Sequence, residues 1–162
     1  MITAWRIVKK KYVKGVLSGE GARGYPGRWN LYGIPMVYVC STPSLAILEV
    51  RVHTGPEGEG IPYVLFQLET PKDLVIKLNI PLPSDWRLNP PQLSTQNIGS
   101  EWAQSGRSAV LQVPSVIVPE DSNLLINPLH KDFKKIRISN EQEYFLDPRL
   151  KNRVRKLSLR TK

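Results

Sequence analysis

One glutamate has an unusual position in a predicted amphipathic helix. Thr42-Pro43 predicts a helix start, because threonine caps helices and proline is favoured at the first helical position. The helix is predicted to end at about His53, and an apolar stripe with i, i+3 and i+7 spacing runs along it: Leu45, Leu48 and Val52. Glu49 lies at i+4 on this stripe, where a carboxylate is costly unless it is paired or faces a cleft. Glu49 is therefore either an ordinary residue at the edge of the helix face or a functional carboxylate.

A second candidate is the glycine-rich segment 19–30, which contains two arginines, two aromatic residues and an amide. The guanidinium of Arg28 could form bidentate contacts with a phosphate or carboxylate, and the aromatic rings offer stacking surfaces. The chain has no GxxxxGK[ST] loop and no GxGxxG that opens a helix after a strand, which argues against P-loop and Rossmann-type nucleotide sites. Taken alone, the segment is equally consistent with a surface loop.

Two polar residues follow predicted strands in the second half of the chain. Pro114 is expected to stiffen a turn and to direct the hydroxyl of Ser115 beyond the strand end. No GxSxG surrounds Ser115, which argues against a nucleophile elbow. Asn127 precedes a proline and is consistent with a simple turn residue. His53 and His130 occur in unrelated contexts and are interpreted as structural or surface residues.

The elements that must position these residues are predicted to be mainly strands. Short runs rich in Val, Ile, Leu and aromatic residues predict strands at residues 4–8, 36–40, 63–68, 73–77, 108–113, 124–126, 135–138 and 144–146. Two further helices are predicted over residues 96–104 and from Asp147-Pro148 into the C-terminal tail. Strands outnumber helices without regular alternation, which predicts a single compact α+β domain with a central mixed or antiparallel sheet and about three helices.

The length and composition indicate an ordinary globular domain. A chain of 162 residues with 41% hydrophobic residues can bury its own core, and no stretch approaches the roughly 20 apolar residues of a membrane span. The chain has one cysteine, Cys40, and no Cys/His cluster with zinc spacing. We therefore expect a cytoplasmic protein with no structural metal and no membrane partner.

The net charge of +9 is located at the two ends of the chain. Residues 149–162 hold seven basic side chains and residues 1–14 hold five, with no acidic residue in either segment. Taking these twelve charges from the total leaves −3 for residues 15–148. We expect a domain over residues 1–150 and a basic helical tail over residues 151–162. A basic nucleic-acid-binding or interaction module remains an alternative function, although no recognisable nucleic-acid-binding fold accompanies the charge.

An ordered set of short motifs resembles the RES-domain family, which is named for an arginine, a glutamate and a serine: Gly21-Ala22-Arg23, Gly27-Arg28-Trp29-Asn30, Val37-Tyr38, Ser44-Leu45-Ala46-Ile47-Leu48-Glu49, Gly99 with Trp102, Val113-Pro114-Ser115, Asn127-Pro128 with His130, and Asp147-Pro148-Arg149-Leu150. The resemblance extends from about Trp5 to Leu150. It implies a fold similar to that of ADP-ribosyltransferase toxins. It also implies an NAD⁺-degrading toxin of a bacterial toxin–antitoxin pair, whose antitoxin carries an Xre-type helix-turn-helix domain.

The resemblance assigns roles to five positions, in which the family's arginine, tyrosine, glutamate, serine and asparagine correspond to Arg28, Tyr38, Glu49, Ser115 and Asn127. It implies that the first three are catalytic, and that the last two bind substrate together with Arg28 and Tyr38. Ser100 departs from the family pattern, because an acidic residue is expected after the glycine at position 99.

The implied reaction gives each residue type a physical task. Cleavage of the nicotinamide–ribose bond develops positive charge on the ribose, as in glycoside hydrolysis, and a carboxylate such as Glu49 stabilises it. Arg28 suits the pyrophosphate, the ring of Tyr38 can stack on nicotinamide, and Ser115 and Asn127 can form hydrogen bonds with the amide or the ribose. The implied enzyme is an NAD⁺ glycohydrolase or NAD⁺ phosphorylase. An ADP-ribosyltransferase that modifies a protein is the alternative.

The resemblance also implies the partners of the protein. NAD⁺ is the substrate, and no further cofactor is expected. An Xre-type antitoxin is expected to neutralise the protein by covering the active site, and DNA is contacted only indirectly through that antitoxin. Whether the protein forms a homodimer within the complex is left open.

Overall fold

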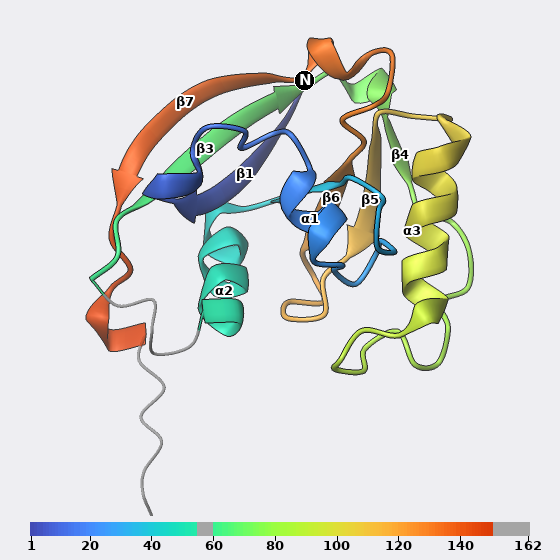
Figure 1. Ribbon diagram of the computed structural model, residues 1–162, viewed down its shortest axis with the longest axis horizontal. Coiled ribbons are helices and arrows are strands. Elements are labelled where there is room, and N and C mark those ends of the chain that lie inside the picture. The colour runs from blue at the N-terminus through green and yellow to red at the C-terminus, as the bar shows by residue number, and fades with distance from the viewer. Residues whose placement is uncertain (55–59, 151–162) are drawn as a thin grey trace, which may run out of the picture.

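The computed structural model describes residues 1–54 and 60–150, and these form one mixed sheet with three α-helices (Figure 1). The strands are β1 (Ile2–Lys9), β2 (Val37–Cys40), β3 (Tyr63–Thr70), β4 (Val75–Lys77), β5 (Val110–Pro114), β6 (Ser122–Ile126) and β7 (Arg137–Tyr144). Their order in the sheet is β4-β5-β6-β2-β1-β3-β7, and only the β4–β5 pair is parallel. The predicted α+β class with a mixed sheet is confirmed.

The sheet consists of two halves that meet at β1 and β2. Strands β1 and β3 pair over eight residues, whereas β1 and β2 share the single register pair Trp5–Cys40. Where β1 and β2 diverge, Nη1 of Arg6 donates a hydrogen bond of 2.6 Å to the main-chain oxygen of Tyr38. Burial lowers the pKa of Arg6 to about 10. The arginine side chain thus replaces a ladder hydrogen bond that the separating strands no longer supply.

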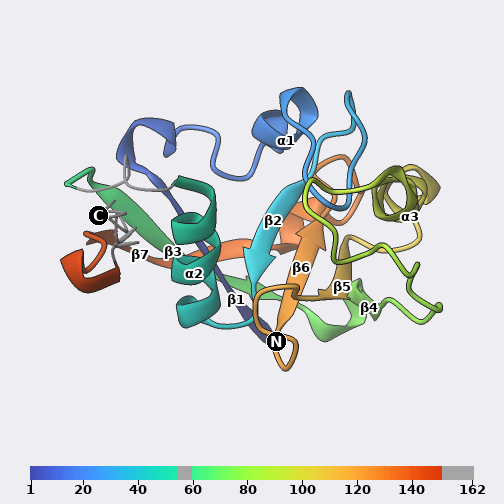
Figure 2. The same ribbon diagram turned by 90° about the horizontal axis from the view of Figure 1, so that it is seen from below.

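Two helices cover one face of this sheet. Helix α2 (Pro43–Thr54) lies beside β1 and β2, and helix α3 (Leu93–Ser105) lies on the β5 side. The view in Figure 2 shows β2 and β6 between these two helices. The short helix α1 (Glu20–Gly24) precedes the loop that leads into β2.

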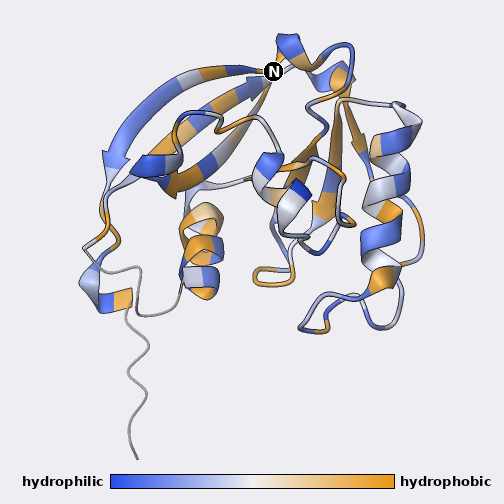
Figure 3. Cartoon of the chain, in the orientation of Figure 1, coloured by the Kyte–Doolittle hydropathy of each residue, from blue (hydrophilic) through white to orange (hydrophobic). Residues whose placement is uncertain are grey.

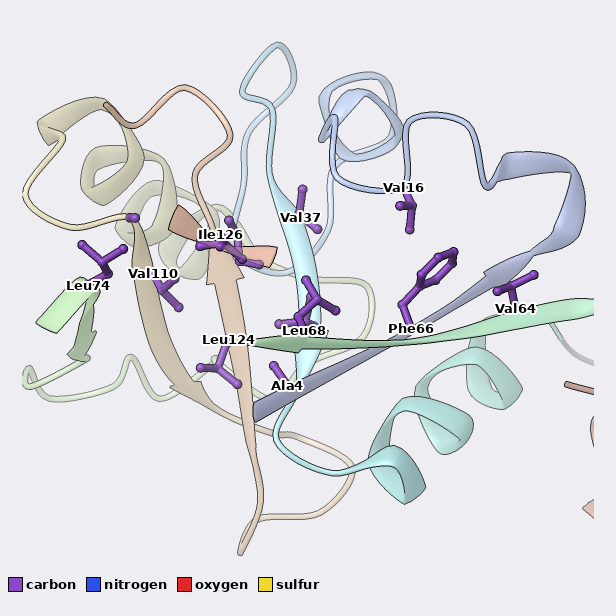
Figure 4. Packing of buried hydrophobic residues seen from close by; sticks show 13 residues of the cluster. Ala4, Val16, Val37, Val64, Phe66, Leu68, Leu74, Val110, Leu124 and Ile126 are labelled. Atoms are coloured by element: carbon purple, nitrogen blue, oxygen red, sulfur yellow. The ribbon is translucent and has the colours of Figure 1, made fainter. Parts of the chain in front are cut away.

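Apolar packing follows the same division. Two apolar clusters lie on the helix-covered face. One joins α2 to β1, β2 and β3, and it includes Leu45, Ala46, Cys40 and Leu65. The other joins α3 to β5 and β6, and it includes Trp102, Leu111, Val113 and Leu125. The opposite face carries a third cluster around Phe66, Leu68 and Leu124, which residues such as Val16 cover (Figure 4). The polar surface of β7 marks the exposed edge of the sheet (Figure 3).

Most predicted elements are present, with small shifts in their bounds. The predicted helix start at Thr42 is confirmed, because its Oγ1 accepts a hydrogen bond of 3.1 Å from the main-chain N–H of Leu45. Helix α3 begins at Leu93, three residues before the predicted start at residue 96. The strands predicted at 135–138 and 144–146 overlap only the two ends of one continuous strand, β7, and its middle was not predicted. Its exposed polar middle concealed this continuity, since all but the last of its residues are exposed.

Two further segments differ in part from their predicted structure. The segment 19–30 was expected to be an exposed loop, but it contains α1, and its last residues Trp29 and Asn30 are buried. The third predicted helix begins as a 3₁₀ turn at Pro148–Leu150, and the tail over residues 151–162 lies outside the described residues. Within residues 1–54 and 60–150, no helix is long and apolar enough to cross a membrane.

Replacement of Gly99 by alanine is expected to destabilise the protein by about 1–3 kcal/mol. A Cβ atom at this position would lie 1.9 Å from the main-chain oxygen of Trp29, so α3 would have to move away from the buried loop. Urea unfolding measures the effect, and Gly21→Ala is the control, since a Cβ there meets nothing within 4 Å. Equal stability of the two variants would contradict direct packing of α3 on the Trp29 backbone.

Candidate functional site

Glu49 lies on the inward face of α2, one turn after the residues that pack on the sheet. Leu45 and Ala46 are almost fully buried, and Glu49 follows them at i+4 and i+3. The predicted apolar stripe is wrong at Val52, which is 63% exposed, because the buried face of α2 is rotated toward Ala46. Glu49 therefore continues the packing face at the point where the helix meets polar groups of the sheet.

The two carboxylate oxygens of Glu49 have different partners. Nδ2 of Asn123, on β6, donates a hydrogen bond of 2.9 Å to Oε1. Nε2 of His53, one helical turn further along α2, lies 3.6 Å from Oε2. Only 25% of the Glu49 side chain is exposed, so the hydrogen bond from Asn123 acts in a partly desolvated setting. Asn123 thus fixes one oxygen and leaves the other on the side of His53.

Arg28 is held by a proline-rich loop that is distant in sequence. Its Nη1 donates hydrogen bonds of 2.6 Å and 2.9 Å to the main-chain oxygens of Trp86 and Leu88. Partial burial lowers the pKa of the guanidinium, whereas Glu49 and Tyr38 act in the opposite direction. The opposite charges of Arg28 and Glu49 therefore act on one another electrostatically.

The loop that carries Arg28 is attached to β2 through Tyr38 and Asn30. The Tyr38 hydroxyl donates a hydrogen bond of 2.7 Å to Oδ1 of Asn30 and accepts one of 3.0 Å from the N–H of Trp29. Burial raises the pKa of Tyr38. A Cβ atom on Gly27 would lie 2.7 Å from the tyrosine oxygen, so the loop can approach the ring only with glycine there. The Tyr38 hydroxyl thus holds the Arg28 loop against β2. Stacking of its ring on nicotinamide stays a prediction.

Helix α3 holds both loops around Arg28. Gln96 donates a hydrogen bond of 3.0 Å to the main-chain oxygen of Gly27, and Ser94 donates one of 2.7 Å to Asp85 in the proline-rich loop. Oγ of the buried Ser100 accepts a hydrogen bond of 2.8 Å from the N–H of Leu31. Ser100, where an acidic residue was expected, therefore contributes to the attachment of the Arg28 loop.

Ser115 lies at the end of the sheet that carries Asn123. It follows β5, where Val113 is paired with Asn123, and its main-chain N–H bonds to Asp121. Its buried Oγ accepts hydrogen bonds of 3.1 Å from the N–H groups of both Ile117 and Val118. These contacts shape the β5–β6 connection, and a direct contact of Ser115 with substrate stays a prediction.

The structure does not bring Asn127 to Glu49. Asn127 comes directly after β6, four residues beyond Asn123, and an extended chain of that length spans about 13 Å. Its Nδ2 donates to the main-chain oxygen of Ala103 at 2.8 Å, and its Oδ1 accepts from the N–H of Leu129 at 3.0 Å. The buried amide thus joins the end of β6 to α3, while its predicted role in substrate binding remains untested.

The resulting arrangement can bind a ligand that has both anionic and electron-deficient parts. A carboxylate on α2 and a guanidinium on the loop before β2 act on one another electrostatically, and two apolar clusters pack on the same face of the sheet. No group of three or more His, Cys, Asp or Glu side chains among residues 1–54 and 60–150 is suited to hold a metal ion. A separate hollow of about 630 Å³ lies beside β7. It is lined by Lys10, Lys14, Val64 and Glu143, which are not part of the group around Glu49 and Arg28.

Sequence reasoning did not identify Asn123 and His53 as members of this group. The i, i+4 spacing of Glu49 and His53 was a usable signal, because residues with this spacing are neighbours on a helix. The contact between Asn123 and Glu49 joins residues 74 positions apart, and it depends on the packing of α2 against β6. Sequence reasoning also could not reveal the carbonyl groups that bind Arg28, since every residue carries one.

Comparisons with known proteins agree on one family. The RES domain matches residues 3–147. A protein of Photorhabdus laumondii named Toxin Res is 41% identical over 148 residues, which are 90% of this chain and 95% of that protein. A Sphingobium protein named Prs ADP-ribosylating toxin is 40% identical over 152 residues, which are 90% of this chain and 94% of that protein.

A solved structure extends the comparison to the fold. A chain in the crystal structure of the M. tuberculosis MbcT–MbcA toxin–antitoxin complex has a TM-score of 0.72 and 19% identity, covering 88% of this chain and 84% of that chain. At this identity the likeness concerns the fold alone. Fold and site together define a single α+β domain with a partly buried acid on α2 and an arginine on the loop before β2. The chain belongs to the RES-domain family, as its sequence motifs indicated.

We expect Asn123→Asp to destabilise the protein by about 1–3 kcal/mol at pH 7, because it replaces the donor to Glu49 with a second carboxylate. The two acids would share a proton, so the folded-state pKa of the pair would be raised. The folded variant would then bind more protons than the unfolded chain, and its deficit would shrink as the pH falls from 7 to 5.

Urea unfolding at both pH values measures this effect, with Asn123→Ala as the uncharged control. The alanine variant is expected to lose similar stability at both pH values. A pH-independent deficit of Asn123→Asp would contradict the contact between residue 123 and Glu49.

Proposed function

We propose that this protein is the toxin of a toxin–antitoxin pair and that it cleaves the nicotinamide–ribose bond of NAD⁺. Membership of the RES-domain family and relatives named as toxins support the toxin function. The observation that carries the proposed chemistry is the Glu49 carboxylate, fixed through one oxygen by Asn123 and placed within electrostatic influence of Arg28.

The proposed reaction uses Glu49 as the stabilising charge. As the bond between C1′ and the pyridinium nitrogen breaks, its electron pair moves to nitrogen and neutral nicotinamide leaves. The ribose gains oxocarbenium character, and a preorganised carboxylate lowers the energy of that state. Oε1 is held by Asn123, so Oε2 is the oxygen placed to face the ribose. A neutral leaving group needs no strong general acid.

The proposed substrate position places the diphosphate at Arg28. Nη1 of Arg28 is bound by two carbonyl groups, and this restraint orients the remaining guanidinium N–H groups without neutralising the charge. The ring of Tyr38 is proposed to support nicotinamide, and Ser115 and Asn127 remain proposed substrate contacts. No cofactor other than the NAD⁺ substrate is proposed.

Three acceptors can complete the reaction. Water gives ADP-ribose, inorganic phosphate gives ADP-ribose 1″-phosphate, and a protein side chain gives an ADP-ribosylated protein. The name of the Sphingobium relative, Prs ADP-ribosylating toxin, favours protein modification as the second candidate function. We retain glycohydrolase or phosphorylase activity as the first candidate.

The proposed regulator is an Xre-type antitoxin that covers the NAD⁺ site in the cytoplasm. A carboxylate on the antitoxin, including a chain terminus, could pair with Arg28 as a phosphate does. The related MbcT–MbcA structure is that of a toxin–antitoxin complex, which is consistent with a protein partner for this chain. DNA binding is assigned to the antitoxin, and a homodimer within the complex is left open.

Incubation of the purified protein with NAD⁺, with and without inorganic phosphate, tests this proposal. Mass spectrometry of the products distinguishes ADP-ribose, ADP-ribose 1″-phosphate and intact NAD⁺, and labelled NAD⁺ with cell extract detects protein modification. Expression without the antitoxin should lower cellular NAD⁺ and arrest growth. Intact NAD⁺ under every acceptor condition, with unchanged cellular NAD⁺, would refute the proposal.

Glu49→Gln is expected to reduce kcat by on the order of 10²–10³, because the amide keeps the side-chain shape but removes the charge that faces the oxocarbenium ion. Steady-state assays measure the loss. Glu101→Gln is the matched control, since Glu101 is exposed on α3 and its change should leave kcat unchanged. Near-normal turnover by Glu49→Gln would leave Glu49 with only a structural role.

Arg28→Ala is expected to raise KM about 10- to 100-fold with a smaller change in kcat, since charge-assisted hydrogen bonds contribute about 1.5–3 kcal/mol. Arg28→Lys should recover only part of the affinity, because lysine lacks the planar fork. Arg137→Ala, on exposed β7, controls for the loss of one positive charge. An unchanged KM and kcat in Arg28→Ala would exclude this residue from the site.

A further inference from the structure

An exposed imidazole lies on the unrestrained side of the Glu49 carboxylate. The side chain of His53 is 77% exposed, and its Nε2 lies 3.6 Å from Oε2 of Glu49. This separation suits an ion pair but is longer than a normal hydrogen bond. Asn123 holds the other oxygen, Oε1. The imidazole therefore flanks the carboxylate where solvent can approach.

The electrostatic surroundings of His53 raise its pKa. The contact with Glu49 raises the pKa of His53 above its ordinary value of 6.5, whereas partial burial and Arg28 act in the opposite direction. Glu49 on its own helix and Arg28 on the facing loop are the charged groups of the described residues that act on this imidazole. A base is most effective when its pKa lies near the working pH.

Neighbouring groups are poorly suited to accept a proton from a nucleophile. The hydroxyl of Tyr38 is bound by Asn30 and Trp29, and its pKa is raised. Arg28 remains positively charged. Asp121 accepts a hydrogen bond of 3.1 Å from Thr42 at the start of α2, at the other end of the helix from His53.

We propose that His53 is the general base that activates the acceptor. This inference rests on the proposed NAD⁺ cleavage, and it identifies the residue that takes the proton from the attacking nucleophile. A water oxygen forms a bond to C1′ while the bond from C1′ to the nicotinamide nitrogen breaks. The acceptor proton passes to His53 and then to solvent, and the electron pair of the broken bond leaves with nicotinamide. Glu49 keeps its negative charge throughout.

The experiment compares the wild-type protein with His53→Gln and His53→Ala, using NAD⁺ as substrate at pH 8. Val52→Ala is the control, because Val52 is the exposed neighbour on the same helix. Each protein is assayed with water alone, with inorganic phosphate and with sodium azide. Azide is an anionic nucleophile with no proton to lose, so its attack on C1′ needs no base. Urea unfolding verifies that the variants are folded.

Both His53 variants are expected to lose activity on the order of 10²-fold in water, with KM for NAD⁺ little changed. Phosphate attacks through an anionic oxygen at pH 8, so its reaction should, like that of azide, depend little on His53. Azide should restore turnover and give 1″-azido-ADP-ribose. Wild-type kcat/KM should rise with pH through the pKa of His53, and this rise should be absent from the pH profiles of the variants.

Three results would overturn the inference in distinguishable ways. Full activity of both variants in water would remove His53 from the reaction, while NAD⁺ cleavage itself would stand. A loss that azide does not restore would assign His53 to positioning of Glu49 and not to proton transfer. Intact NAD⁺ with the wild-type protein in all three media would refute the proposed function, and the inference with it.

Discussion

The side chain of Asn30 connects the strands of this protein to the loop that carries Arg28. Asn30 is completely buried, and its Oδ1 accepts hydrogen bonds from the Tyr38 hydroxyl and the N–H of Gly27. Its Nδ2 lies 2.7–3.2 Å from three main-chain oxygens of the surrounding segments. A buried amide is stable only when such partners are present. The requirement to satisfy one side chain thus fixes the loop against β2 and, with α3, places Arg28 near Glu49.

The fold was predictable wherever local sequence carried a strong signal. The apolar runs of β1, β2, β3, β5 and β6 indicated their positions, and Thr42-Pro43 indicated the start of α2. Strand β7 was divided in two because its exposed residues lack an apolar pattern. The exposure of Val52 was also missed, since spacing defines a stripe but does not determine how the helix is rotated on its sheet.

The candidate site was predictable in part, and mainly through family motifs. Glu49 stood out because of its place on α2, while the roles of Arg28 and Tyr38 came from the resemblance. The contact of Asn123 with Glu49 and the carbonyl groups that hold Arg28 depend on tertiary packing across 58 to 74 residues. Such contacts leave no local pattern. Asn127 is a residue of the family motifs, but its observed contact attaches α3 to the end of β6. A motif can therefore also mark a residue that stabilises the fold.

A crystal structure of the Glu49→Gln protein bound to NAD⁺ tests the central claim most directly, because this variant should bind the substrate but turn it over slowly. We predict that the nicotinamide ribose lies within hydrogen-bond distance of residue 49 and the diphosphate against Arg28. Binding of NAD⁺ at a position where Arg28 and residue 49 are both free of contact would contradict that claim.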